Sequence, residues 1–181
     1  MPTIISHAAV PLALGLGLGR RWISPRLLLA GVVLAMLPDL DVLSFKLGVA
    51  YGDALGHRGF SHALLTAALC AAGLSGVARY LGARLWMCWL FLFVAMASHG
   101  LLDTLTNGGH GVALLWPWSD TRWFAPWRPI EVSPIGFSFL SLRGLVVLAS
   151  ELLWIWLPAW VVMLCLCAWL PEAKPWQTAQ A

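Results

Sequence analysis

Charged residues are scarce in this sequence. Asp, Glu, Lys and Arg make up 10% of its 181 residues, while hydrophobic residues make up 60%. Soluble domains average about 25% charged residues, so this composition excludes an ordinary water-soluble protein. The net charge is only +3 and the arginines are scattered, which excludes a nucleic-acid-binding surface. We expect residues 1–181 to form a single membrane-embedded domain.

Motifs for several common chemistries are also missing. The four cysteines lie inside apolar runs, at spacings that fit neither a zinc ribbon nor a redox pair, so we expect small buried hydrophobic residues. Absence of Gly-Lys-Ser/Thr excludes a phosphate-binding P-loop, and absence of His-Glu-x-x-His disfavours a zinc metalloprotease. No Lys or Arg precedes the first apolar run, so we expect that run to remain in the mature protein.

Long apolar runs dominate the sequence. A helix needs about 20 mostly apolar residues to cross the hydrocarbon core of a bilayer. The predicted fold is therefore all-α, a polytopic membrane bundle of about five transmembrane helices. Their expected ranges are 4–19, 27–43, 60–78, 85–106 and a tilted span within 137–170. Residues 1–135 would carry the functional core, and 137–170 would form the C-terminal helix.

Arginines in the short loops predict the orientation of the bundle. They are Arg20, Arg21 and Arg26 between the first two helices, and Arg79 and Arg84 between the third and fourth. Cytoplasmic loops are enriched in Lys and Arg, so both loops are expected in the cytoplasm. The N-terminus would then lie outside, and the C-terminus, with Lys174, would be cytoplasmic.

Histidine and aspartate residues gather at the outer ends of the predicted helices. Hairpin connectivity would bring four of the five histidines and three of the five aspartates to a single layer. These residues are His7, Asp39, Asp41, His57, His62, His99 and Asp103. Ionisable groups at membrane depth are costly and usually functional, so we expect a functional site in this layer.

The spacing of these residues favours a metal site. His99 and Asp103 are four residues apart, which places both side chains on one face of a helix. Imidazole and carboxylate ligands suit a divalent transition metal, Zn²⁺ first and Mn²⁺ as the alternative, and the lack of thiolates argues against a closed structural zinc site. We expect His62, His99 and Asp103 to bind the metal directly, followed by His7 and Asp39.

The same residues also have purely structural interpretations. A histidine in an apolar span can hydrogen-bond across helices, and an aspartate at a helix end can stabilise a turn. The sequence therefore leaves open whether Asp39 or Asp41, and His57 or His62, is the ligand. Two further candidate ligands are His110 and Glu131.

A loop rich in Trp and Pro, residues 107–136, follows the fourth predicted helix. Its aromatic residues are typical of the belt at a membrane interface. An alternative interpretation is a lid over the site, in which Arg122 or Arg128 meets a phosphate.

Four sequence blocks carry a family resemblance. They are the early His7, Leu37-Pro38-Asp39-Leu40-Asp41, His57-Arg58-Gly59-Phe60-Ser61-His62 and Ser98-His99-Gly100-Leu101-Leu102-Asp103, in this order within residues 1–135. In these blocks the sequence resembles the YdjM-like family of inner-membrane metal-dependent hydrolases. The resemblance implies a multi-pass protein of the bacterial inner membrane with a metal site built from these residues.

A weaker similarity is to zinc-dependent phospholipase C. Those enzymes use a helical bundle, an N-terminal ligand, and His-x-x-x-Asp followed shortly by another histidine. The corresponding residues here are His7, His99, Asp103 and His110. The spacing to the last histidine is one residue longer and no His-x-x-x-Glu follows, so a three-metal site is not expected.

The leading functional hypothesis is a metal-dependent hydrolase that cleaves a phosphoester or related bond in a lipid or lipid-linked substrate at the outer membrane face. Asp41 or His57 is the candidate base, and Arg58 is a candidate phosphate contact. The alternatives are a metal-binding membrane protein without catalysis and an interaction protein whose polar cluster locks the bundle. We expect no nucleic-acid partner, and the sequence does not indicate a protein partner.

Overall fold

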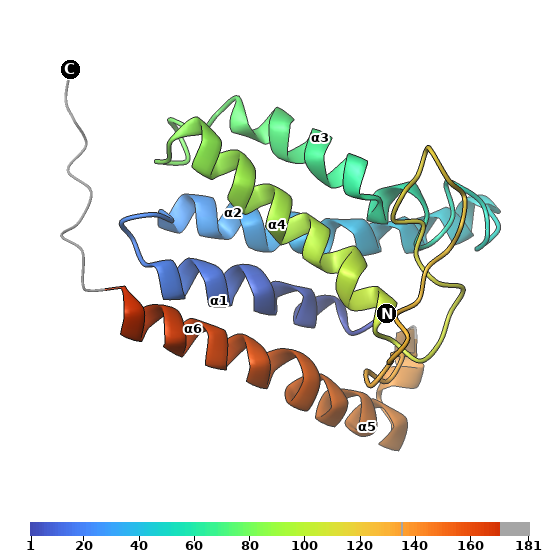
Figure 1. Cartoon of the computed structure of the whole chain (residues 1–181). Helices are drawn as coiled ribbons and strands as arrows, with labels where there is room; N and C mark the ends of the chain where they lie inside the picture. The colour runs from blue at the N-terminus through green and yellow to red at the C-terminus, as the bar shows by residue number, and fades with distance from the viewer. Residues whose placement is uncertain (135, 171–181) are drawn as a thin grey trace.

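The computed structural model describes residues 1–134 and 136–170, which are all-helical and contain no strand. This confirms the predicted all-α fold. Helices lie side by side along one bundle (Figure 1). The elements are η1 (Ile4–Ala8), α1 (Ala9–Leu18), α2 (Pro25–Met36), η2 (Leu37–Leu47), η3 (Phe60–His62), α3 (Leu64–Ser75), α4 (Leu85–Thr104), η4 (Gly136–Phe139), α5 (Leu142–Glu151), η5 (Leu152–Trp156) and α6 (Leu157–Trp169).

Two apolar clusters hold the helices together. The larger one joins α2, α3 and α4 through side chains such as Leu27, Ala71 and Leu92. The smaller one joins α1 to the C-terminal helix, with Ala13 facing the Ala159 region. Small residues at these contacts let the backbones approach closely, as is usual for helices that pack in a membrane.

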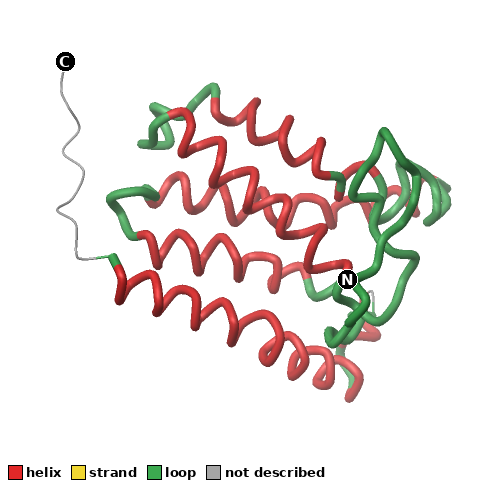
Figure 2. The backbone as a smooth tube through the Cα atoms, in the orientation of Figure 1, coloured by secondary structure: helices red, strands yellow, loops and turns green. Residues whose placement is uncertain are grey.

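The loops that matter for the site gather at one end of the bundle. Figure 2 shows the long green loops together at the end that also holds the N-terminus. They comprise residues 48–59, between η2 and η3, and residues 105–134, after α4. The hairpin connectivity expected from the sequence is therefore present, and the ends of helices that are distant in sequence meet here.

The α2 helix continues into a tighter turn near this end. Ser24 caps its start, where its hydroxyl accepts a hydrogen bond from the Leu27 amide, and Pro25 occupies the first turn. From Leu37 the chain follows a 3-10 helix, and Gly48 ends it with a positive φ of 76°. This turn carries two aspartates of the predicted site into the loop-rich end.

The C-terminal helix is one 28-residue run, Leu142–Trp169, with a wide π-helical turn at Leu152–Trp156. Pro158 lies directly after that turn and has no backbone N–H to donate to the carbonyl four residues earlier. The missing N–H of this proline accounts for the wide turn just before it.

Within residues 1–134 and 136–170, three helices are long and apolar enough to cross a membrane: Pro25–Leu47, Leu85–Thr104 and Leu142–Trp169. Two other apolar helices, Ile4–Leu18 and Leu64–Ser75, are shorter. At 1.5 Å per residue they fall short of a hydrocarbon core of about 30 Å. The sequence predicted about five transmembrane helices. That these two shorter helices also cross the membrane stays a prediction, as does the orientation of the bundle.

Candidate metal centre

The five predicted ligands come together at the loop-rich end. His7 lies in η1, Asp39 in η2, His62 at the end of η3, and His99 and Asp103 in the last turns of α4. Each exposes at most 3% of its surface. Side chains that are up to 96 positions apart in the sequence, from residue 7 to residue 103, are thus buried in one layer.

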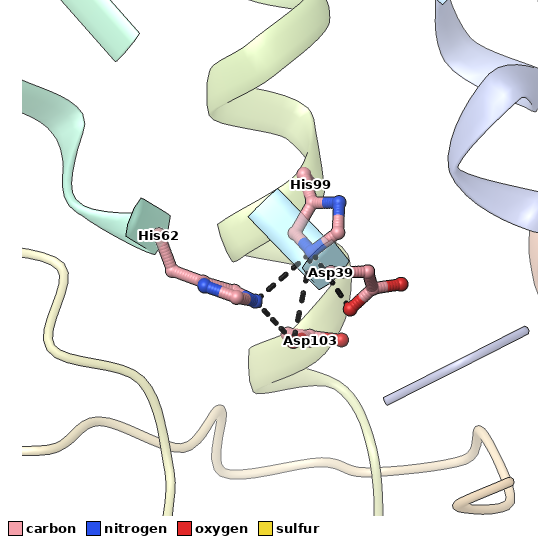
Figure 3. Close-up of side chains that lie close together, drawn as sticks. All are labelled: Asp39, His62, His99 and Asp103. Atoms are coloured by element: carbon pink, nitrogen blue, oxygen red, sulfur yellow. Dashed lines mark hydrogen bonds and ion pairs between the residues drawn. The ribbon is translucent and has the colours of Figure 1, made fainter. Parts of the chain in front are cut away.

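Four of these side chains surround a common point (Figure 3). One donor atom from each of Asp39, His62, His99 and Asp103 can be chosen so that all lie within 4.8 Å of one another. His99 Nε2 lies 3.4 Å from Asp39 Oδ1, and His62 Nε2 lies 3.2 Å from Asp103 Oδ2. Two donors that bind one zinc ion at tetrahedral angles lie about 3.4 Å apart. This group could hold a metal ion.

Hydrogen bonds on the far side of both histidine rings determine which nitrogen carries the proton. His99 Nδ1 donates to the carbonyl oxygen of Ala35 at 2.7 Å, and His62 Nδ1 lies 2.9 Å from the Ser61 hydroxyl and 3.2 Å from Asp41 Oδ2. In the neutral tautomer that these contacts favour, both Nε2 atoms are unprotonated, and they face each other at 3.0 Å, close enough to share a proton or to bind one cation. A cation between them would remove the repulsion between the lone pairs, and such outer contacts are typical of metal-binding histidines.

The surroundings of the Asp39 and Asp103 carboxylates show whether a cation fits between the four side chains. In the described part of the chain, none of their four oxygens accepts a hydrogen bond, although all four are buried. An unsatisfied buried polar group costs roughly 1–3 kcal/mol, and more when it is charged. Arg58 supplies one positive charge against these two negative charges. A metal cation fits the remaining negative charge, the oxygens that form no hydrogen bond and the donor set of oxygen and imidazole nitrogen.

Arg58 lies behind Asp103, with its side chain fully buried. Its Nε is 3.1 Å from Asp103 Oδ2, its Nη1 donates to the Gly108 carbonyl, and its Nη2 donates to the Thr106 hydroxyl, both at 2.9 Å. Its backbone has a φ of 62°, which is unusual for a residue other than glycine. These contacts suit a residue that positions Asp103, and its predicted contact with a phosphate stays a prediction.

Asp41 links two histidines next to this group. Its Oδ1 lies 2.5 Å from His57 Nδ1, and its Oδ2 faces His62 Nδ1 and accepts a hydrogen bond from the Ser61 hydroxyl at 2.6 Å. Asp41, His57 and His62 also have donors close enough to hold a metal ion. Their facing atoms are already paired with one another, however, so the geometry fits a hydrogen-bonded relay that orients both rings.

The two further candidate ligands lie elsewhere. His110 is exposed and its ring packs on Tyr51, with the ring centroids 4.5 Å apart. Glu131 forms an ion pair with Arg143 at 2.6 Å, and a hydrogen bond with Asn107 together with this ion pair lowers the pKa of Glu131. Among the described residues, neither belongs to a group of donors that could hold a metal.

The Trp-rich loop is fastened beside the site. Arg122 donates to the carbonyl oxygens of Tyr51, Gly52, Asp53 and His57, which ties this loop to the 48–59 loop. Arg128 lies over the ring of Phe124, 4.8 Å from its centroid. Both arginines thus have contacts within the protein, and the proposed lid with a phosphate contact stays a prediction.

Glu151 is a buried residue that the sequence did not assign to the site. It is 1% exposed, and its carboxylate accepts hydrogen bonds from the amide and hydroxyl of Thr3 and from the hydroxyl of Ser6. These bonds fasten η1, which carries His7, to the C-terminal helix. The available signal was a lone acidic residue inside an apolar run, because such residues are usually functional or structurally paired.

Comparison with known proteins gives a consistent result. The model of the YdjM inner membrane protein family matches residues 1–174. The chain is also similar to the inner membrane protein YbcI of Escherichia coli (strain K12), with 55% identity over 165 residues that cover 90% of this chain and 95% of that protein. No solved structure matches. The match extends beyond the 1–135 region that carried the resemblance in the sequence.

Proposed function

The chain belongs to the YdjM inner membrane protein family, and we propose that it is a metal-dependent hydrolase of a phosphoester or related bond in a lipid or lipid-linked substrate. One observation carries the proposal: two histidines and two aspartates converge in a buried layer in which the carboxylate oxygens form no hydrogen bond among the described residues, and Arg58 is paired with only one of the two carboxylates. Buried carboxylates are stable only when positive charge compensates them, and the single charge of Arg58 compensates one of these two.

Asp39, His62, His99 and Asp103 would hold the ion, Zn²⁺ or alternatively Mn²⁺. When bound, such an ion supplies a Lewis acid that polarises the scissile group and brings the pKa of water close to neutrality. The Ala35 carbonyl and the Asp41 carboxylate keep the two histidine rings turned toward the ion. Arg58 keeps the Asp103 carboxylate in place and balances part of its charge.

Asp41 and His57 are suited to moving a proton. Because Asp41 accepts a hydrogen bond from His57 Nδ1, the other ring nitrogen of His57 is left to act as the base. Alternatively, Asp41 itself takes the proton. In both cases the pair is separate from the four metal-binding residues and connects to them through His62.

An apolar groove supports a lipid substrate. It has a volume of about 210 Å³ and lies between α1, α4 and the C-terminal helix, where Ala13, Leu102 and Ala159 line it. Leu102 is adjacent in sequence to Asp103, so the groove reaches the helix that carries the site. An acyl chain fits the chemistry of this groove, and the arginine-rich short loops at the opposite end of the bundle favour an outer location for the site.

A metal site without catalysis is the second candidate, and the burial of the ligands favours it. The four side chains expose between 0 and 3% of their surface and supply four protein donors. Structural zinc sites have complete protein coordination, whereas catalytic sites keep one position open. In this case the ion would stabilise the helix ends and would exchange slowly.

Hydrolysis by the detergent-solubilised protein tests the proposal. We expect slow release of product from a panel of phosphate-bearing lipids and lipid-linked precursors, abolished by a chelator and restored by Zn²⁺ or Mn²⁺. The His99→Ala variant should be inactive under all of these conditions, while His110→Ala, which removes an exposed histidine, should retain activity. A panel without turnover, together with metal that stays bound, would favour the non-catalytic site.

A further inference from the structure

The carboxylates of Asp39 and Asp103 each face two histidines, one from each oxygen. Asp39 Oδ1 lies 3.4 Å from His99 Nε2, while its Oδ2 lies 3.7 Å from His7 Nε2. Asp103 Oδ2 lies 3.2 Å from His62 Nε2, while its Oδ1 lies 3.8 Å from His7 Nε2. One oxygen of each carboxylate therefore belongs to the four-residue group, and the other oxygen points to His7.

The ring nitrogens of His7 form no hydrogen bond with the described residues. Its side chain is fully buried. The ring stacks on His99, with centroids 3.5 Å apart and an angle of 16° between the planes. The two parallel rings thus direct their Nε2 atoms toward the same pair of carboxylates.

We propose a second cation site formed by His7 Nε2, Asp39 Oδ2 and Asp103 Oδ1. The two carboxylates would then bridge a pair of ions, the first held with His62 and His99 and the second with His7. Each separation between His7 Nε2 and a carboxylate oxygen, 3.7 Å to Asp39 and 3.8 Å to Asp103, fits a pair of donors on one ion, because donors about 2.1 Å from a metal lie between about 3.0 Å apart at right angles and 4.2 Å apart when opposite. Paired ions in hydrolytic sites are about 3.5–4 Å apart.

Charge indicates which substrate such a pair would bind. Asp39, Asp41 and Asp103 contribute three negative charges, and Arg58 contributes one positive charge. One divalent ion balances this group, and a second ion leaves an excess of positive charge in a buried site. An anionic substrate group such as a phosphate balances that excess. This inference rests on the proposed function and narrows it to a two-ion phosphoester hydrolase.

Metal content and magnetic coupling test the second site. Protein purified with Mn²⁺ should contain two ions per chain, and its electron paramagnetic resonance spectrum should show a spin-coupled pair. His7→Ala should reduce the content to one ion and give the hyperfine spectrum of isolated Mn²⁺. His7→Gln, which keeps a polar side chain of similar length, should behave in the same way if the loss reflects the ligand and not misfolding. His110→Ala is the matched control and should keep both ions.

The possible results separate this inference from the proposed function. One ion per chain in the unaltered protein, retained in His7→Ala, would overturn the second site while leaving the hydrolase proposal intact. One ion that is lost in both His7 variants would make His7 a ligand of the first ion and would also overturn the second site. Protein that binds no metal at all would overturn both proposals.

Discussion

Arg58 Nε lies 3.1 Å from Asp103 Oδ2, and both side chains are completely buried. The remaining contacts of the guanidinium are made to Thr106 and Gly108, at the start of the loop that follows α4. The orientation of Asp103 is thereby coupled to the path of this loop. Removing one partner of a buried charge pair is strongly destabilising, because the other charge is left buried without compensation.

Arg58→Lys should weaken metal binding because an ammonium cannot make the three separate contacts of the guanidinium. We expect the metal dissociation constant to rise about 10–100-fold, as is typical when an outer contact of a ligand is lost. Competition with a chromophoric chelator measures this change. Arg128→Lys, at an exposed arginine, is the control. Equal affinities in the two variants would contradict the positioning role of Arg58.

Asp41→Asn should separate proton transfer from metal binding. The amide cannot accept hydrogen bonds from both His57 and His62 or carry the negative charge that faces them. We expect turnover to fall about 10²–10⁴-fold at saturating metal, while metal content stays near that of the unaltered protein. Asp53→Asn, in the exposed loop, should leave both quantities unchanged. Turnover that survives in Asp41→Asn would assign the base elsewhere.

Glu151→Gln should destabilise the bundle. An amide nitrogen replaces one of the two oxygens that accept hydrogen bonds from Thr3 and Ser6, so a buried donor is left facing a donor. We expect a loss of about 1–3 kcal/mol in the free energy of unfolding and a Tm lower by several degrees. Tryptophan fluorescence during heating measures the transition.

Glu131→Gln provides the matched comparison for this effect. Glu131 forms an ion pair with Arg143, but the two side chains are 28% and 47% exposed. Pairs at the surface contribute about 0–1 kcal/mol, so this variant should unfold close to the unaltered protein. Similar shifts in both variants would mean that the Glu151 network does not hold η1.

Much of the fold followed from the lengths of the apolar runs. The apolar runs predicted helices that the structure contains, and alternating helix directions brought His7, Asp39, His62 and Asp103 to one end. The i, i+4 spacing of His99 and Asp103 placed them together because a helix fixes that geometry. Local rules of this kind need no knowledge of tertiary contacts.

Other features depended on contacts that no spacing reveals. The burial of Arg58 requires the loop after α4 to fold back over it, and the burial of Glu151 requires the C-terminal helix to meet the first residues of the chain. Histidine and glutamate are common metal ligands, but in the structure His110 packs on Tyr51 and Glu131 pairs with Arg143. Residue type alone cannot distinguish a group in the site from one beside it.

The orientation of the bundle can be tested with reporter fusions. Because Lys and Arg are enriched in cytoplasmic loops, fusions after Arg21 and Arg84 should report a cytoplasmic location. Fusions near Gly52 and Asp120 should report an external location. The inverse pattern would keep the candidate site intact but would move it to the cytoplasmic face, where a different pool of lipids would reach it.

The metal content of the purified protein tests the central claim most directly, which is that the buried histidine and aspartate layer binds a transition metal. Elemental analysis of the unaltered protein should find one or two ions per chain, roughly as in catalytic sites of this kind. His99→Ala and Asp103→Ala should each lose most of that metal while remaining folded in detergent, and His110→Ala should retain it. Full retention of the metal in both His99→Ala and Asp103→Ala would contradict the account.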